Sequence, residues 1–428
     1  MMENRISGMI LGSIIGDALG TPIDGFSKGH ISSIFKSSYG FVDPTPALKG
    51  KMDRWKKPGL YSSISQFIIL LSCFLNSRKK FNGGDLFDFI KDLPEIPGSQ
   101  YGIFRHPDKM ERQFLERVTM GDSDSRDGVS SIITARLAAI IPSLVQYRTK
   151  SVSNHIYRTI SISLLFSQNI SSIAGAVIFA VLLKRILNDS SPLSSINMIS
   201  IAKEEIASLF EEIDINTDKI FNIGINPVSF LNIIEEYKTI FMNIENIGDK
   251  HEAAENIYTY VNKGIKSPIT RATVNHPMAI IPYSIYLASQ YKESPSDILF
   301  HAAWEGGSTS ILCTLIGALT GAAFGNEWIS GEIRDGLINK KRIFSIVEAI
   351  SKGRIFESLL QDFIKAEASL TIKESQEKNA KLKHIKQKPK KRKVGKDREA
   401  ELSKHVVESW TKIDKAKWRK NINKQNKE

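Results

Sequence analysis

Three short stretches of the chain combine hydroxyl, carboxylate and glycine residues at spacings that could do chemistry. They are "GDALGTPIDG", which contains Asp24, "SSIS", which begins at Ser62, and "GGSTS", which contains Gly307, Ser308 and Ser310. In the last two stretches the hydroxyls precede apolar helical runs, where backbone N–H groups and the helix dipole favour a negative charge. One interpretation is therefore that both helix starts are candidate anion-binding positions, with Ser63 in one stretch and Gly307, Ser308 and Ser310 in the other.

The alternative interpretation is plain helix capping. The stretch "SSISQ" fits a capping box with Ser63 as the N-cap and Gln66 as the third helical residue. Ser308 or Ser310 would make an ordinary N-cap for the helix that follows. Under this alternative the side chains satisfy local N–H groups and perform no chemistry.

Two rows of glycines indicate which elements position these stretches. Gly8, Gly12, Gly16 and Gly20 recur every four residues, as do Gly317, Gly321 and Gly325. Each glycine inside a helix costs about 1 kcal/mol relative to alanine, so the rows require a compensating contact. We expect the helices 5–19 and 311–324 to cross with their backbones in close contact.

Apolar residues recur at three- and four-residue spacings through most of the chain, while alternating runs are scarce. This pattern predicts an all-α fold, with helices that include 64–76, 129–146, 171–187 and 354–368. The segment 171–187 is shorter than the roughly 20 apolar residues of a membrane span, so we expect a core helix and no membrane.

Composition restricts the class of protein. The chain of 428 residues is 42% hydrophobic and 24% charged, as is typical of globular proteins. Cys73 and Cys313 lie in apolar runs and form neither a disulfide framework nor a zinc motif. We therefore expect a reducing, cytoplasmic location, and the N-terminus shows no signal-peptide pattern because Asp17 interrupts its apolar run.

The charge is concentrated at the C-terminal end. Residues 371–428 contain 20 Lys or Arg and 8 Asp or Glu, which accounts for the whole formal net charge of +12. We expect a helical domain at 1–370 and a basic tail at 371–428 that is disordered or partly helical. Its stretch "PKKRKV" indicates nucleic-acid binding, a nuclear signal if the source is eukaryotic, or a solvated lysine tail. The candidate nucleic-acid-binding residues are Lys388, Lys390, Lys391, Arg392 and Lys393.

At both ends of the helical part the sequence resembles a known family. The stretch "GMILGSIIGDALGTPIDG" is similar to the opening signature of the ADP-ribosylglycohydrolases, and "GGSTSILCTLIGALTGAAFG" is similar to their closing signature. The resemblance implies an all-α orthogonal helical bundle with a two-magnesium site at the bottom of an ADP-ribose cleft. It extends over residues 5 to 340.

The same comparison shows what this chain has lost. The resemblance places the family's first acidic pair on Ser63 and Ile64 and its second on Ser308 and Ser310. A neighbouring hydroxyl ligand falls on Ile311, while Ser62 keeps the hydroxyl of a threonine ligand and Asp24 replaces a glutamate. Magnesium prefers carboxylate oxygens, so we expect no metal cofactor here.

These departures lead to three hypotheses. The first is a catalytically retired ADP-ribosylglycohydrolase-like protein that binds ADP-ribose or another anion without metal, as a binding or regulatory module. The second is a hydrolase that removes ADP-ribose without metal, with Asp24 as its candidate catalytic residue. The third is a partner of nucleic acid or protein that acts through the basic tail.

Overall fold

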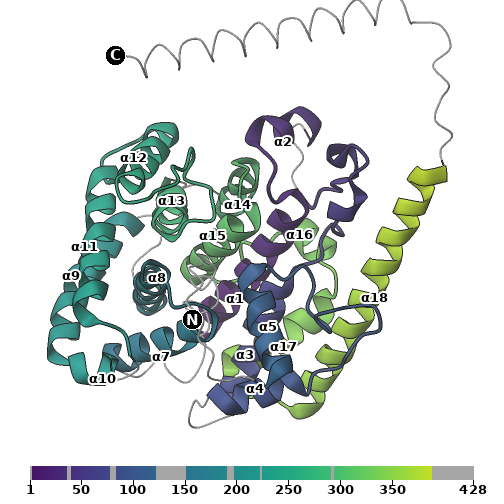
Figure 1. Cartoon of the computed structure of the whole chain (residues 1–428), viewed down its shortest axis with the longest axis horizontal. Helices are drawn as coiled ribbons and strands as arrows, with labels where there is room; N and C mark the ends of the chain where they lie inside the picture. The colour runs from purple at the N-terminus through teal and green to yellow at the C-terminus, as the bar shows by residue number, and fades with distance from the viewer. Residues whose placement is uncertain are drawn as a thin grey trace, which may run out of the picture. The chain divides into compact units, whose positions relative to one another are not determined.

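The regular elements of this protein are helices wherever the structure describes the chain (Figure 1). The computed structural model describes residues 2–35, 40–77, 83–121, 151–189, 197–221, 224–290 and 294–387. The predicted all-α fold is confirmed. The helix expected at 129–146 and the basic residues from Lys388 to Lys393 lie outside the described residues.

The elements have the following bounds. They are α1 (Met2–Gly20), η1 (Thr21–Ile23), α2 (Lys28–Phe35), η2 (Thr45–Leu48), η3 (Met52–Arg54), α3 (Ser63–Ser77), α4 (Gly83–Lys91), α5 (Lys109–Met120), α7 (Val152–Phe166), α8 (Ile170–Asn188), α9 (Met198–Ile215), α10 (Thr217–Phe221), α11 (Pro227–Ile244), α12 (Lys250–Asn262), α13 (Pro277–Gln290), α14 (Pro295–Trp304), α15 (Thr309–Phe324), α16 (Gly331–Gly336), α17 (Lys340–Lys352) and α18 (Glu357–Gln387).

Helices α1 and α15 form the centre of the fold and pack antiparallel through their glycines. A Cβ atom on Gly12 would overlap the carbonyl oxygen of Gly317, and one on Gly8 would overlap the carbonyl oxygen of Gly325. A Cβ atom on Gly321 would likewise overlap the carbonyl oxygen of Gly8. The predicted crossing is confirmed: the glycines let the two backbones touch, and the contact compensates for their low helix propensity.

The remaining apolar helices surround this pair. Helix α15 contacts α13, α14 and α8, and α8 in turn packs against α7, α9 and α11. Two helical stretches, Met2–Ile23 and Ile170–Asn188, are long and apolar enough to span a membrane. Most of each stretch is buried inside the fold, as is typical of core helices.

Helix α18 is longer than the expected helix 354–368. It runs past residue 370, where we placed the end of the helical domain, and continues to Gln387. The contacts divide the chain into two units, Met1–Asn379 and Ala380–Glu428, so most of α18 belongs to the first unit. Glu367 and Glu374 explain the extension, because both are buried against the domain although they stand in a polar stretch.

Two long loops complete the surroundings of the site. One leads from α2 through η2 and η3 to Ser63 at the start of α3, and the other leads from α4 to Lys109 at the start of α5. The loops are joined where the Ser63 N–H donates to the Arg105 carbonyl at 2.7 Å. They therefore bring the first turns of α3 and α5 together.

Candidate functional site

The buried carboxylate of Asp17 lies between the first turns of α3 and α15. Asp17 is fully buried in α1, and its oxygens accept hydrogen bonds from the Ser62 N–H at 2.8 Å and the Ser62 hydroxyl at 2.9 Å. The hydroxyls of Thr21 at 2.7 Å, Ser65 at 2.7 Å and Ser310 at 3.1 Å also donate to it. This carboxylate therefore supplies the negative charge that two helix N-termini favour.

A second buried carboxylate faces Ser63. Glu111 accepts the Ser63 hydroxyl at 2.7 Å and the Asp108 N–H at 2.8 Å through the same oxygen. The Asp108 side chain caps α5 in return by accepting from the N–H groups of Met110 and Glu111. The capping box of α5 thus places Glu111 against the first residue of α3.

Asp24 reaches the first turn of α15 from the other side. Its Oδ1 accepts the Ser310 N–H at 3.2 Å. The approach depends on the turn before α15, where Gly307 donates to the Phe26 carbonyl and accepts from the Gly25 N–H, each at 2.8 Å. Gly307 has φ 78, and a Cβ there would overlap Thr273, so this position requires glycine.

A small cavity of about 110 Å³ joins these groups. Its carboxylates are Asp24, Asp108 and Glu111, and Lys56 is the lysine among its lining residues. The other lining residues are Thr21, Ser62, Ile64, His106, Asn275, Ser308, Ser310 and Ile311. The structure therefore brings the predicted site residues Asp24, Ser62, Ile64, Ser308, Ser310 and Ile311 to one cavity, with Ser63 and Gly307 in contact with its walls.

The capping-box interpretation of Ser63 is wrong. Helix α3 begins at Ser63, whose hydroxyl donates to Glu111, and the Gln66 amide donates to the Ile103 carbonyl and to Glu367, both at 2.8 Å. The local cap comes from the preceding residue, because the Ser62 hydroxyl accepts the Ile64 N–H at 3.3 Å. Ser308 is the N-cap residue of α15, but its side chain makes no capping hydrogen bond.

The residues present do not fit a pair of magnesium ions. The positions that hold metal in the resemblance carry serine hydroxyls and two isoleucine side chains, and Ser63 and Ser310 already donate to carboxylates. A hydroxyl beside a carboxylate forms a hydrogen bond with it, so the pair needs no cation and supplies less negative charge to hold one than two carboxylates would. Among the described ranges, no group of three or more His, Cys, Asp or Glu is arranged to hold a metal ion.

Sequence reasoning missed Asp17 and Glu111 as site residues. Asp17 did carry a signal, because a carboxylate inside an otherwise apolar helix is costly unless several donors satisfy it. Glu111 had a weaker signal, because residues 108–111, "DKME", follow the capping-box pattern at the start of a helix distant in sequence from Ser63. The same buried environment affects Cys313, where burial, and then the charges of Asp24 and Asp17, raise the pKa of the thiol.

His106 borders both this cavity and a second pocket of about 360 Å³. Its Nε2 lies 2.9 Å and 3.0 Å from the two oxygens of Glu374, a buried residue of α18. Burial alone would raise the pKa of Glu374, but His106, the Lys57 N–H and Arg105 hold it at about 2. Glu374 is therefore ionised at neutral pH.

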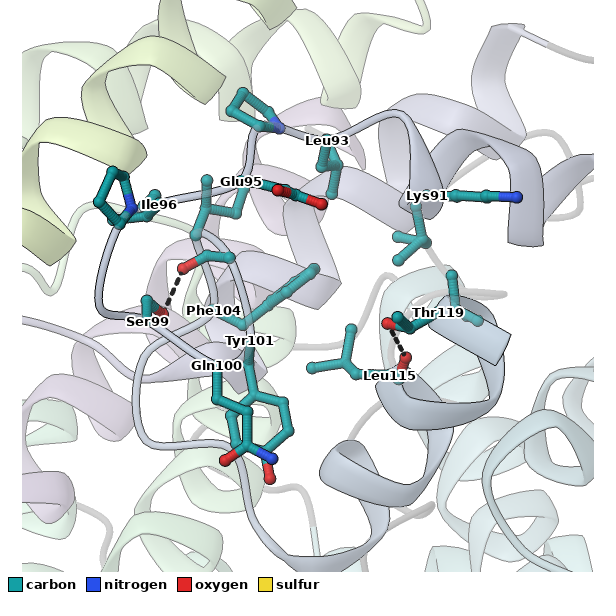
Figure 2. A pocket seen from close by; sticks show the side chains of 16 residues that line it. Lys91, Leu93, Glu95, Ile96, Ser99, Gln100, Tyr101, Phe104, Leu115 and Thr119 are labelled. Atoms are coloured by element: carbon teal, nitrogen blue, oxygen red, sulfur yellow. Dashed lines mark hydrogen bonds between the residues drawn. The ribbon is translucent and has the colours of Figure 1, made fainter. Parts of the chain in front are cut away.

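A larger groove of about 730 Å³ lies between the loop after α4 and the end of α5. Figure 2 shows Tyr101 and Gln100 on the loop and Leu115 and Thr119 on the helix. Apolar side chains from Ile90 to Val118 form much of its lining, and it contains none of the predicted site residues. The groove is separate from the serine and carboxylate cluster.

Comparisons with known proteins agree with the helical fold. A solved "ADP-ribosylglycohydrolase-related protein complex" has a TM-score of 0.55 and 15% sequence identity, and the match covers 83% of this chain and 99% of that chain. At that identity the likeness shows the fold. No curated protein sequence matches. The family model described as ADP-ribosylglycohydrolase matches residues 1–361, so the chain belongs to the ADP-ribosylglycohydrolase family.

Proposed function

We propose that this protein uses the ADP-ribosylglycohydrolase fold to bind ADP-ribose, or a related nucleotide, without metal and without hydrolysis. One observation carries the proposal: serine hydroxyls at former metal-ligand positions donate to the buried carboxylates, Ser63 to Glu111 and Ser310 to Asp17. In this arrangement the two carboxylates are satisfied by internal hydrogen bonds. The donors do not match magnesium, so we expect ligand binding without a water-activating cation.

The chemistry of the cavity favours a sugar at its base. Asp24 and Asp108 offer carboxylate oxygens and Ser308 offers a hydroxyl, which suit the donors and acceptors of a ribose diol. The volume of about 110 Å³ is below the roughly 300–1,000 Å³ of sites for drug-sized ligands. The cavity would therefore take only the terminal ribose of ADP-ribose, with the pyrophosphate outside near Lys56.

This refines the expected anion site. The N–H of Ser310 already donates to Asp24 at 3.2 Å, and three carboxylates line the cavity beside one lysine. A free phosphate would meet these charges at short range, which disfavours it. We therefore propose binding through the ribose and expect inorganic phosphate to bind more weakly than ADP-ribose.

Calorimetry of the full chain with ADP-ribose in the presence of a chelator tests the binding. We expect a dissociation constant in the range of roughly micromolar to millimolar, no change on adding magnesium, and no release of ADP-ribose from modified arginine or serine. A matched variant is Ser308→Leu, which fills the cavity without touching the bonds of Asp17. Wild-type affinity in this variant, or hydrolysis abolished by the chelator, would contradict the proposal.

The second candidate function is metal-independent hydrolysis of the glycosidic bond. It is supported by Asp24, a half-buried carboxylate that lines the cavity and replaces the glutamate of the family pattern. Turnover in the presence of a chelator that is lost in Asp24→Asn would establish this activity in place of simple binding.

Binding of nucleic acid through the basic tail remains a prediction. It is tested by comparing the nucleic-acid affinity of the full chain with that of a chain that ends at residue 387.

A further inference from the structure

Helix α18 continues beyond the family match, which ends at residue 361, and its later turns hold the two loops that frame the cavity. Glu367 is fully buried and accepts hydrogen bonds from Tyr61 at 2.5 Å, Gln66 at 2.8 Å and Arg105 at 2.6 Å. Asn339 also donates to it at 3.0 Å. One carboxylate of α18 thus joins the loop before α3, the first turn of α3 and the loop before α5.

Glu374 repeats the arrangement two turns later. One of its oxygens accepts the Lys57 backbone N–H at 2.9 Å, and both of its oxygens face Nε2 of His106. Between the two acids, the Thr371 hydroxyl donates to the Ile103 carbonyl at 2.8 Å. The face of α18 from Glu367 to Glu374 is therefore bonded to both loops.

The backbone of His106 is strained at this contact. Its φ is 51, in the left-handed region that residues other than glycine seldom adopt. Such a conformation persists only where surrounding contacts hold it, and here Glu374 holds the ring. Because His106 lines the cavity and the lining residues Asp108 and Glu111 follow it within five positions, the position of His106 affects the cavity wall.

We propose that α18 from Glu367 to Glu374 is a clamp of the cavity, with Glu367 and Glu374 as positioning residues, and that clamp docking and ADP-ribose binding stabilise each other. The α18 residues of the clamp lie beyond the residues that the family model matches, whereas their partners in the two loops lie within them. The coupling to ADP-ribose rests on the proposed function, whereas the effect of the clamp on the loops does not. If both hold, an event that detaches α18 lowers the affinity of the cavity, and a bound ligand strengthens the docking of α18.

Hydrogen exchange on the full chain tests the clamp with Glu374→Gln, which keeps the size of the side chain and removes its charge. Glu377→Gln is the matched control, because Glu377 lies one turn away and forms a more exposed ion pair with the Lys57 ammonium. We expect segments 57–63 and 103–108 to exchange at least tenfold faster in Glu374→Gln, with α1 and α15 unchanged. The control should leave both segments as in the wild type.

The comparison with α1 and α15 separates a clamp from general destabilisation. If these helices and the two loop segments accelerate equally, or if Glu377→Gln has the same effect as Glu374→Gln, the clamp proposal is wrong. Unchanged exchange in Glu374→Gln also overturns it. Glu374→Asp, which keeps the charge on a shorter arm, should restore at least part of the protection.

Calorimetry with ADP-ribose then tests the coupling. We expect Glu374→Gln to weaken binding at least fivefold, Glu377→Gln to leave it unchanged, and ADP-ribose to slow exchange around Glu374 in the wild type. If the wild type does not bind ADP-ribose, the proposed function fails while the exchange experiment still decides the clamp. If the wild type binds and Glu374→Gln binds equally well, the coupling is wrong and the binding stands.

Discussion

The Ser310 hydroxyl donates to the Asp17 carboxylate at 3.1 Å although the two residues are 293 positions apart. The same carboxylate accepts from Ser62, which ties the first turn of α3 to it as well. One acidic side chain of the first helix therefore connects three elements. Where the family resemblance places acidic ligands and cations, this chain has a junction in which neutral donors hydrogen-bond the carboxylate.

Removing the Asp17 carboxylate should destabilise the domain strongly. Asp17→Ala leaves the Ser62 N–H and several hydroxyls buried without an acceptor, at about 1–3 kcal/mol for each unsatisfied group. We expect a total loss of about 3–5 kcal/mol in the free energy of unfolding, measured by urea denaturation with circular dichroism. Asp24→Ala is the control, since Asp24 is half-buried and accepts one N–H at 3.2 Å. A loss below about 1 kcal/mol in Asp17→Ala would contradict the role of this residue.

Filling the interface between α1 and α15 should separate the helices. Gly12→Leu places a side chain against the Gly317 backbone, which cannot move aside as a flexible side chain could. Overpacking of this kind costs about 1–3 kcal/mol or more, and thermal unfolding should report it. Gly29→Ala is the control, because an added Cβ there meets no atom within 4 Å. It should be neutral or slightly stabilising, and equal effects of the two substitutions would argue against the close crossing.

Restoring the acidic positions should make the protein dependent on magnesium. In the variant Ser63→Asp/Ile64→Asp/Ser308→Asp/Ser310→Asp, new carboxylates face Glu111 and Asp17 in place of hydroxyl donors, so like charges repel at short range. We expect a lower melting temperature in chelator and a rise of several degrees with millimolar magnesium. The wild type should show no such rise. A magnesium-stabilised wild type would mean that the present site still binds the ion.

Acidification should destabilise the fold through His155. This histidine is fully buried, and burial, together with the charge of Lys184, lowers its pKa from 6.5 to about 4. Since the folded pKa lies below the unfolded one, the contribution to stability is complete above pH 6.5 and is lost as the pH falls toward 4. The loss is on the order of 3 kcal/mol.

The measurement for His155 is the free energy of unfolding at pH 7 and pH 4.5. His155→Gln should reduce the difference between the two values, because glutamine does not titrate in this range. His301→Gln, at an exposed position, is the control. Equal pH dependence in the wild type and His155→Gln would exclude His155 as the cause.

The parts of the structure that follow local rules could be predicted from the sequence. The four-residue spacing of Gly8, Gly12 and Gly16 determines one helix face, so the crossing with α15 could be anticipated. The partners of Ser63 and Gln66 could not, because Glu111 and Glu367 lie 48 and 301 positions away. A capping box and a long-range hydrogen-bond network use the same residue types. Sequence spacing alone therefore favours the capping box, whose partners are close in the sequence.

The full length of helix α18 could not be predicted from the sequence for a related reason. Glu367 and Glu374 lie in a stretch that becomes steadily more polar, which is typical of a solvated extension. Glu367 is buried because Arg105, on a distant loop, gives it a buried ionic partner, and Glu374 is buried because it accepts the Lys57 N–H and lies against the half-buried His106 ring. Contacts of this kind have no periodic signature in the sequence, so their positions could be found only from the three-dimensional structure.

The glycine contact between α1 and α15 also has a consequence for synthesis of the chain. Helix α1 leaves the ribosome before α15, and the backbone that covers its glycine face is made about 300 residues later. At roughly 5–20 residues per second, that interval is roughly 15–60 s. During this time α1, an apolar helix with weak intrinsic helix propensity, has no α15 to pack against, and Asp17 lacks the hydrogen bond from Ser310. The nascent chain should therefore need protection from aggregation until residue 325 has emerged, and the cavity can form only after nearly the whole domain is complete.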